Sequence, residues 1–396
     1  MSRIFVTGMG IISAIGHSLV QNRQSLREGK CGITDTLDLF PSKYAGILSF
    51  GTVSKSNHEL QEQFNAHEPG VTRTSLLALH AFSEAIAHSG LTSEQIKRGD
   101  TALIGASTVG GMCLTDELYQ DANKTEEGSP YLSSYDNASV NIYLQERSGI
   151  GGIVNTINTA CSSSANSIMY GANLIKQGLA KRAIVGGADS LAKFTINGFH
   201  ALHILSPGKC QPFDEARSGL NLGEGAAFLV LEREEDLNGK KVYAELTGYS
   251  NTNDAYHPSS LSDEGDGPFL AMQGALNNAG LQANDISFIN AHGTGTENND
   301  LVESVAMKRL FGTPPPFAST KSNTGHTLGA SGSVEAVYSI LNLVEQEIYP
   351  GLRFETPIAA TGLTPVQEYK KREMRHIMSN SFGFGGNCSS LIFSKA

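Results

Sequence analysis

The sequence predicts an α/β protein made of two similar halves. Short apolar runs bounded by glycine predict buried strands, and longer segments with helical periodicity lie between them. A similar order of elements recurs in the second half of the chain, which predicts a duplicated βα unit. The composition agrees with a folded protein, because 40% of the residues are hydrophobic and only 17% are charged.

The individual elements follow from local patterns. Strands are predicted at 4–6, 102–105, 154–158, 183–187, 228–232, 286–290 and 390–393. Helices are predicted at 74–89, 165–180, 268–280 and 333–346. The polar segments 113–140 and 251–267 show no period. We expect each to be an irregular loop, either a functional cap or a solvated surface loop.

The duplication rests on the order of these elements. In each half a helix and a strand are followed by a turn of small residues that opens another helix, and then by a glycine-rich segment. The two turns lie at 159–165 and 322–330. We therefore expect an N-terminal half over 1–240 and a C-terminal half over 241–396, with the functional turns of both meeting near a pseudo-twofold axis.

Bulk properties exclude several classes of protein. The net charge of −10 argues against wholesale nucleic-acid binding. The five cysteines are odd in number and form no C-x-x-C pair, which indicates a reduced, cytoplasmic protein. The first residues, Met1–Gly8, do not have the pattern of a signal peptide, and no run reaches the roughly 18 apolar residues of a membrane span.

Cys161 is the candidate nucleophile. It follows the strand at 154–158 and begins the segment that becomes a helix. A cysteine at a helix N-terminus faces the positive end of the helix dipole, which can lower the thiol pKa to roughly 3.5–7.5. The small residues 162–165 leave room for a substrate, and their N–H groups are candidate oxyanion donors. The alternative is a buried structural cysteine.

Two histidines lie beside glycine turns. His292 is at the tip of a Gly-Thr turn that follows a predicted strand, where its imidazole can face a cleft. Lys321 and His326 flank a second glycine turn, and Glu335 lies on the helix that follows, so these three are candidates for one polar network. The alternatives are a hydrogen-bonded turn histidine, a solvated lysine and a surface glutamate.

Phe384 has glycines on both sides, which predicts a mobile aromatic gate whose N–H is a second oxyanion donor; the alternative is an apolar turn packed on the core. Other motifs are missing. The chain has no complete dinucleotide fingerprint, no Walker loop, no G-x-S-x-G elbow and no Cys/His cluster with zinc spacing. We therefore expect neither a bound nucleotide nor a metal.

Together these segments resemble the elongating β-ketoacyl–acyl-carrier-protein synthases, which are condensing enzymes of the thiolase superfamily with a Cys-His-His centre. The resemblance runs from Val6-Thr-Gly-Met-Gly to Ser381-Phe-Gly-Phe-Gly-Gly and includes 212–226. It implies a thiolase-like fold with layers in the order α-β-α-β-α. It also implies the catalytic set Cys161, His292, His326, Lys321 and Glu335, with Phe384 as the gate.

The resemblance implies further contacts to substrate. Thr294 and Thr296 match threonines that line the path of the carrier's arm, and Val109 matches the residue at the floor of the acyl pocket. Glycine at that floor would deepen the pocket and isoleucine would restrict it. Valine therefore predicts acyl chains that are medium in length or unsaturated.

The implied reaction is a decarboxylative Claisen condensation of malonyl carrier with an acyl group held on Cys161, in fatty-acid or polyene/polyketide-type biosynthesis. The implied partner is an acyl carrier protein whose phosphopantetheine arm bears the acyl or malonyl group. A basic patch would receive it, with Arg73 and Lys209 as candidates. The chemistry needs no metal or redox cofactor, and the chain is expected to form a homodimer or a heterodimer with a related chain.

Some positions depart from the family pattern. Asn387 and Cys388 stand where Thr-Asn is usual, Ser218 stands where aspartate is common, and serines follow the nucleophile. The pathway is therefore left open. The alternatives are a thiolase-type enzyme with Cys388 as base, a thioester-hydrolysing cysteine enzyme, and the active half of a ketosynthase/chain-length-factor heterodimer. Cys161 argues against a chain-length partner that lacks the nucleophile.

Overall fold

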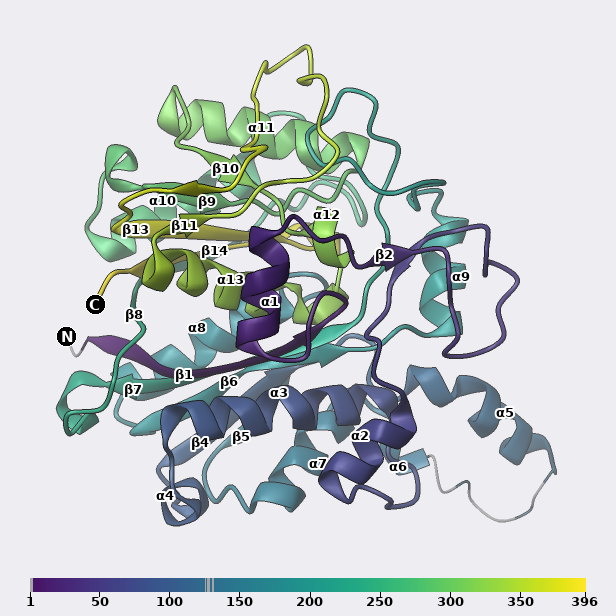
Figure 1. Ribbon diagram of the computed structural model, residues 1–396. Coiled ribbons are helices and arrows are strands. Elements are labelled where there is room, and N and C mark those ends of the chain that lie inside the picture. The colour runs from purple at the N-terminus through teal and green to yellow at the C-terminus, as the bar shows by residue number, and fades with distance from the viewer. Residues whose placement is uncertain (1–2, 125, 127–128, 130–131) are drawn as a thin grey trace.

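The computed structural model describes residues 3–124, 126, 129 and 132–396. Over these residues the centre of the molecule is a mixed ten-stranded sheet in the order β10-β9-β13-β14-β8-β1-β7-β6-β4-β5 (Figure 1). Its strands are β1 (Ile4–Ser13), β4 (Thr101–Ala106), β5 (Val154–Ile157), β6 (Arg182–Asp189), β7 (Gly225–Arg233), β8 (Ala244–Asn253), β9 (Phe288–Asn290), β10 (Phe317–Ala318), β13 (His376–Phe382) and β14 (Asn387–Ser394). Two small sheets pair β2 (Ile33–Thr34) with β3 (Phe50–Gly51) and β11 (Glu347–Ile348) with β12 (Lys370–Lys371).

The strand order repeats between the two halves. The first five strands run β1-β7-β6-β4-β5, and the second five run β8-β14-β13-β9-β10. The pairings also match, because the first two in each series are antiparallel and the last two are parallel. β1 pairs with β8 at the junction, where Phe5 lies opposite Glu245 and Val6 opposite Ala244. The duplication expected from the sequence is therefore present in the topology.

Helices complete five layers, which Figure 1 shows from bottom to top. α3 (Arg73–Ser89) packs on β1 and β7, and α10 (Asp266–Ala279) packs on β8 and β14. Between the two sets of strands, α8 (Ser163–Lys176) and α13 (Ser331–Glu345) pack against each other. The remaining helices are α1 (Leu19–Arg27), α2 (Asn57–Phe64), α4 (Ser93–Lys97), α5 (Thr115–Lys124), α6 (Leu132–Tyr135), α7 (Ser139–Ser148), α9 (Lys193–Ala201), α11 (Glu297–Phe311) and α12 (Lys321–Thr324).

Small residues bring the two central helices together. A Cβ placed on Gly332 of α13 would lie 2.6 Å from the backbone N of Ala165 in α8, so only glycine permits this approach. The N–H of Ser333 donates to Oγ of Ser164 at 2.8 Å, which ties the same two helix starts together. The turn before α8 and the turn before α13 therefore lie side by side, although about 165 residues separate them in the sequence.

The α/β class and the layered thiolase-like arrangement are confirmed, and every strand and helix predicted from the sequence is present within a few residues. The expectation that 113–140 is irregular is wrong, because α5, α6 and the start of α7 lie there; residues 125, 127–128 and 130–131 are outside the described part. Of the strands in the ten-stranded sheet, β8, β10 and β13 were not predicted. The boundary at 240 falls between β7 and β8 and stays a prediction.

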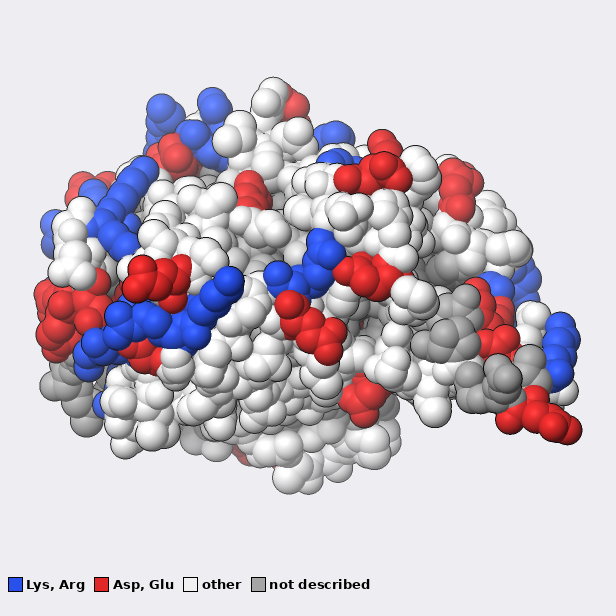
Figure 2. Space-filling view, turned by 90° about the horizontal axis from the view of Figure 1, so that it is seen from below, with Lys and Arg blue, Asp and Glu red and all other residues white. Residues whose placement is uncertain are grey.

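Figure 2 views the molecule from below, and on this face acidic and basic side chains are interleaved rather than gathered into a basic field. This mixture agrees with the net charge of −10. Among the described helices, none combines the length and apolar character needed to cross a membrane.

Candidate active site

The nucleophile turn lies between β5 and α8. Ala160 has a φ of +53°, which reverses the chain after β5 and places Cys161 just before the first turn of α8. The N–H of Ser163 donates to the carbonyl of Ala160 at 3.1 Å and closes this turn. Cys161 is 6% exposed. A residue held in the left-handed region without glycine stores strain, which is frequent at functional sites.

Cys161, His292 and His326 face one another across a cavity of about 370 Å³. Sγ of Cys161 and one nitrogen of each ring all lie within 4.8 Å of one another. The two imidazole rings have centroids 5.4 Å apart and meet edge to face at 84°. Thr294, Thr296 and Phe384 line the same cavity, so the structure brings most of the predicted site residues together.

Each imidazole is held through Nδ1. The ammonium of Lys321 donates to Nδ1 of His292 at 3.1 Å, and the N–H of Leu328 donates to Nδ1 of His326 at 3.2 Å. A neutral ring that accepts at Nδ1 carries its proton on Nε2. Nε2 of His326 is buried and has no hydrogen-bond partner among the residues that the structure describes. The site therefore presents N–H donors, rather than lone pairs, towards Cys161.

Both histidines are neutral. Burial lowers the pKa of His292 well below its usual value, and the charge of Lys321 and the neighbouring His326 lower it further. Burial and then Lys321 likewise lower the pKa of His326. The three clustered donor atoms are also of a type that a soft metal binds. Coordination through Nε2 would move each proton to Nδ1, where it would oppose the donors that are already there.

Lys321 is fully buried and is held by several acceptors. Besides Nδ1 of His292, its ammonium donates to the carbonyl of His292 at 2.7 Å and to a carboxylate oxygen of Glu335. Glu335 also accepts from Oγ of Ser331 at 3.1 Å. Of the three candidates for one polar network, Lys321 and Glu335 are joined, but the hydrogen bonds of Lys321 to a histidine go to His292, and Lys321 acts on His326 only through its charge.

The resting thiol is protonated. Burial raises the pKa of Cys161 to about 11, against the charge of Lys321 and a hydrogen bond from the N–H of Phe384, which lower it. This direction is opposite to the lowering expected from the helix dipole, because removing a thiolate from water disfavours its charged form.

Phe384 lines the cavity from a glycine-rich turn. It begins the short 3₁₀ turn η5 (Phe384–Gly386), in which Gly385 and Gly386 have φ of +81° and +78°. A Cβ on Gly383 would lie 2.8 Å from the carbonyl of Thr159, so glycine lets this turn reach the nucleophile. The ring of Phe384 stacks on Phe199 of α9, with centroids 5.8 Å apart and planes at 19°.

Several supporting residues were not found from the sequence. Glu303 on α11 accepts the N–H groups of His292 and Gly293 at 2.9 and 2.8 Å, and burial raises its pKa to about 7. Asp300, one helical turn earlier, accepts from the N–H groups of Thr294 and Gly295. The spacing of two carboxylates three apart on a helix, just after a glycine turn, is a signal that could have indicated them.

Asn387, one of the departures from the family pattern, joins three elements. Its Oδ1 accepts from Oγ of Ser162 at 2.7 Å, from Nδ2 of Asn166 at 2.9 Å and from Nδ2 of Asn251 at 2.7 Å. These bonds connect the end of the Phe384 turn with the start of α8 and with β8. Asn387 therefore stabilises the turn next to the nucleophile.

Other predicted residues lie elsewhere. Val109 is buried in an apolar cluster with Leu220 and Leu328 and does not line the 370 Å³ cavity itself. Cys388 is fully buried in β14 and does not line that cavity, so it is not placed as a thiolase-type base. Arg73 cannot receive a carrier protein, because it is buried and donates to both carboxylate oxygens of Glu224; Lys209 is exposed.

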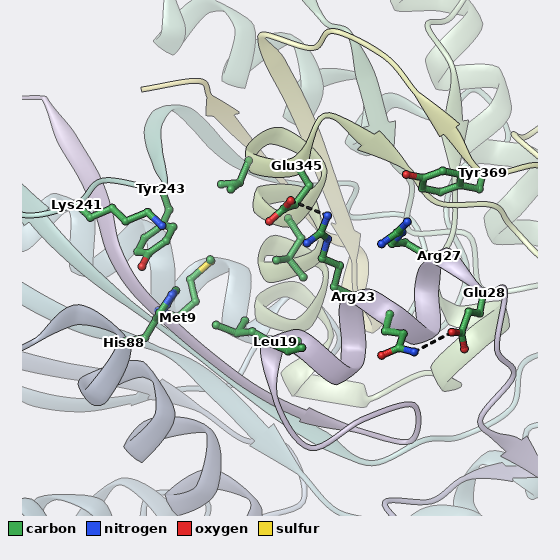
Figure 3. Close-up of a pocket in the computed structure, with 14 residues that line it drawn as sticks. Met9, Leu19, Arg23, Arg27, Glu28, His88, Lys241, Tyr243, Glu345 and Tyr369 are labelled. Atoms are coloured by element: carbon green, nitrogen blue, oxygen red, sulfur yellow. Dashed lines mark hydrogen bonds and ion pairs between the residues drawn. The ribbon is translucent and has the colours of Figure 1, made fainter.

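A larger hollow of about 540 Å³ lies between α1, the end of α13 and the segment before β8 (Figure 3). Its charges are already paired within the protein. Arg23 forms an ion pair with Glu345 at 2.6 Å, Arg27 lies over the ring of Tyr369, and Lys241 lies over the ring of Tyr243. The hollow has no nucleophile, and it is not the active site.

Comparisons with known proteins agree with this geometry. Residues 1–237 match the family model of the β-ketoacyl synthase N-terminal domain, and 243–355 match that of the C-terminal domain. The chain is 33% identical to a 3-oxoacyl-[acyl-carrier-protein] synthase 2 of Vibrio cholerae, over 99% of both chains. It is 32% identical to the protein of the same name from Staphylococcus aureus, over 99% of this chain and 98% of the other.

Solved structures show the same fold. The ishigamide ketosynthase/chain length factor matches with a TM-score of 0.93 and 28% identity, over 100% of this chain and 99% of the other. The ketosynthase ApeO in complex with its chain length factor ApeC from Xenorhabdus doucetiae matches with a TM-score of 0.86 and 30% identity, over 100% and 98%. A β-ketoacyl synthase from Burkholderia phymatum matches with a TM-score of 0.91 and 28% identity, over the full length of both.

The layered fold and the facing thiol and imidazoles define a thiolase-like condensing enzyme, an acyltransferase. Within that class, the chain belongs to the β-ketoacyl synthase family.

Proposed function

We propose that the protein condenses malonyl carrier with an acyl group held on Cys161 and releases a β-ketoacyl carrier two carbons longer. The observation that carries the proposal is the pair of neutral imidazoles, held at Nδ1, which leaves two N–H donors facing the thiol. Such a pair stabilises negative charge on a thioester oxygen without supplying a strong base.

The first half-reaction loads the enzyme. Sγ of Cys161 attacks the thioester carbonyl of the acyl carrier, the C–S bond to the carrier breaks, and the carrier thiol leaves with the proton that Cys161 gives up. The N–H groups of Cys161 and Phe384 are the donors assigned to the tetrahedral oxyanion. In the free enzyme the N–H of Phe384 is close enough to lower the pKa of the Cys161 thiol, so it lies near the reacting atoms.

The second half-reaction makes the carbon–carbon bond. The thioester oxygen of malonyl carrier accepts the Nε2–H groups of His292 and His326 while the carboxylate leaves as CO₂, and the electron pair of the broken bond forms an enolate. The enolate carbon attacks the Cys161 thioester, the C–S bond breaks, and the thiolate that leaves takes up a proton from water. Lys321 and Glu335 keep the first imidazole neutral and in place, while Thr294 and Thr296 line the approach.

The partner in this proposal is an acyl carrier protein whose phosphopantetheine arm enters the 370 Å³ cavity. The chain is proposed to act as a dimer, either with itself or with a related chain-length factor, as in two of the solved complexes. It is proposed to work in the cytoplasm, which suits five free cysteines. The pathway is fatty-acid or polyene/polyketide-type biosynthesis.

The test is a mass-spectrometric assay of carrier-bound products. The purified protein is incubated with malonyl carrier and a panel of acyl carriers, with Cys161→Ala as the control. A carrier-bound product two carbons longer that retains its keto oxygen, and is absent in the control, is the expected result. Free acid without extension would instead identify a thioester hydrolase, the second class of enzyme that the thiol allows. A loaded Cys161 that turns over only after a related chain is added would identify half of a heterodimer.

A further inference from the structure

Asp189 is a buried carboxylate to which the mechanism above gives no role. It is the last residue of β6 and is 0% exposed. Its hydrogen bonds all come from N–H and O–H groups on two separate turns, one after β4 and one before α13. A buried carboxylate is stable only while it keeps such hydrogen bonds, so the same bonds also hold the donor groups of both turns in place.

The first turn follows β4. Oδ1 of Asp189 accepts from Oγ of Ser107 at 2.7 Å, from the N–H of Thr108 at 2.9 Å and from the N–H of Val109 at 2.8 Å. Oδ2 accepts from Oγ1 of Thr108 at 2.6 Å. One carboxylate thus satisfies the donors of three consecutive residues.

The second turn carries the catalytic imidazole. Oδ2 of Asp189 also accepts from the N–H of Gly329 at 2.7 Å. The residue before it, Leu328, has a φ of +53°, and its N–H is the group that donates to Nδ1 of His326. A leucine in the left-handed region costs free energy, so it persists only where its neighbours hold it. The bond from Gly329 to Asp189 is such a restraint on the adjacent residue.

We propose that Asp189 is a positioning residue: by holding Gly329 it keeps the Leu328 N–H on Nδ1 of His326 and so fixes the Nε2–H tautomer of that histidine. This inference rests on the proposed function, because it matters only if the Nε2–H of His326 stabilises the enolate. Asp189 touches neither substrate nor reacting atoms, and it acts through the turn.

Glycine at position 329 is part of the arrangement. A Cβ there would lie 2.8 Å from Oδ2 of Asp189 and 2.9 Å from Cγ2 of Thr108. Both distances are too short, so Gly329→Ala would push the turn away from the carboxylate. This variant breaks the same contact as a change at Asp189 but leaves the carboxylate in place.

The variant Asp189→Asn distinguishes the effects of the two turns on activity. In Asp189→Asn the NH₂ group must face either the N–H groups of Thr108 and Val109 or the N–H of Gly329, and each opposed donor pair costs free energy. Facing Gly329 opposes the N–H of Gly329 and only the longer, 3.1 Å branch of the shared Thr108 N–H, which keeps its 2.9 Å bond to the other oxygen, and the Thr108 hydroxyl can rotate to accept. Facing Thr108 and Val109 opposes two short backbone bonds, of 2.9 and 2.8 Å. The variant is therefore expected to keep the first turn and release the second.

The experiment measures the two half-reactions separately in the full-length enzyme. Acylation of Cys161 is followed by intact mass with an acyl carrier, and decarboxylation of malonyl carrier is followed by CO₂ release. For Asp189→Asn we expect acylation within about twofold of the wild type and decarboxylation at least about tenfold slower in kcat, with KM unchanged. Gly329→Ala is expected to show the same split. Thr108→Val, which removes the hydroxyl donor but spares Gly329, is the matched control and should change neither rate by more than about twofold.

A second readout reports the tautomer directly. Histidine-selective ¹⁵N labelling, with the signal of His326 assigned by its loss in His326→Gln, should show Nε2–H in the wild type and Thr108→Val, and a shift towards Nδ1–H in Asp189→Asn. Equal losses in both half-reactions with an unchanged tautomer would overturn the inference, as would full decarboxylation by Asp189→Asn. If the wild type does not decarboxylate malonyl carrier, the proposed function fails. The tautomer comparison then still decides whether Asp189 positions His326.

Discussion

The ammonium of Lys321 lies 3.1 Å from Nδ1 of His292 and also binds the carboxylate of Glu335. One buried cation therefore holds a neutral imidazole in the tautomer that the proposed reaction needs, while its own charge is balanced by a carboxylate. The pair costs desolvation free energy, and its benefit is the fixed orientation of the imidazole.

Breaking this ion pair on one side should be more harmful than removing both charges. In Lys321→Gln the carboxylate of Glu335 is left buried without a cation, so we expect the free energy of unfolding to fall by about 3–5 kcal/mol. In the double variant Lys321→Gln/Glu335→Gln much of this loss should be recovered, although decarboxylation stays slow. Urea denaturation of the two single variants and the double variant checks this; a double variant as unstable as the sum of the singles would contradict it.

The thiol of Cys161 should react slowly with alkylating agents at neutral pH. Because burial raises its pKa to about 11, the thiolate fraction at pH 8 is on the order of one in a thousand and grows about tenfold per pH unit. The rate of iodoacetamide labelling of Cys161, followed by peptide mass and compared with a free thiol, should still be rising at pH 10. A plateau by pH 7 would mean that the helix dipole outweighs desolvation.

Glu303 should make stability depend on pH. Burial raises its pKa to about 7 from an ordinary value of 4.5. Its protonated form is favoured in the folded state, so its contribution is full below about pH 4.5 and is lost as pH rises to about 7. The expected loss is about 3 kcal/mol. Thermal or urea unfolding at several pH values should show a fall that is larger by this amount in the wild type than in Glu303→Gln, because other buried carboxyl groups act equally in both proteins. Parallel curves for the two proteins would refute the assignment.

Phe199 should hold the ring of Phe384 in place over the active-site cavity. Its ring stacks on Phe384, so Phe199→Ala frees the turn and should let water reach the acyl-enzyme. We expect release of free acid to rise severalfold relative to condensation, on the scale of a lost aromatic contact of about 1 kcal/mol. Phe194→Ala is the matched control, because Phe194 lies on the same helix and is 59% exposed. Equal product ratios in both variants would remove Phe199 from the gate.

Val109 remains the predicted determinant of chain length. Val109→Gly empties part of the apolar cluster with Leu220 and Leu328 and should cost about 1–3 kcal/mol in stability. Because Leu220 also lines the cavity, the space gained adjoins the acyl-binding region, and the products should become longer. Mass spectrometry of products from matched acyl carriers tests this, and unchanged lengths at full loading of Cys161 would reject the role.

Much of the fold and the site could be predicted because local patterns agree with the tertiary structure. The runs at 102–105 and 183–187 are apolar throughout, as parallel strands buried on both faces require. β8 was missed because its polar end, 250–253, looks like a loop unless the alternation before it is followed through. β13 was missed because its last residues were read together with the glycine-rich turn at 383–386 that follows it, and the whole segment was interpreted as a turn.

The features of the site that could not be predicted are contacts between segments that lie far apart in the sequence. The sequence placed Lys321 and His326 in one motif, but the folded turn sends the lysine to His292, 29 residues away. The depressed thiol pKa failed for the same reason, because a helix dipole is a local property whereas the burial of Cys161 comes from the whole protein. The roles of Glu303 and Asp189 depend on backbone donors that no side-chain motif records.

The repeated strand order divides the active site between the two halves. β5 leads into the turn with Cys161, and β10, its counterpart in the second half, leads into the turn with Lys321 and His326. The equivalent turns of the two halves therefore have different roles: the turn after β5 carries the nucleophile, and the turn after β10 carries charge-stabilising groups. Neither copy holds a complete centre. The centre therefore depends on the contact between the two copies, and a change that shifts one against the other would separate the nucleophile from its partners.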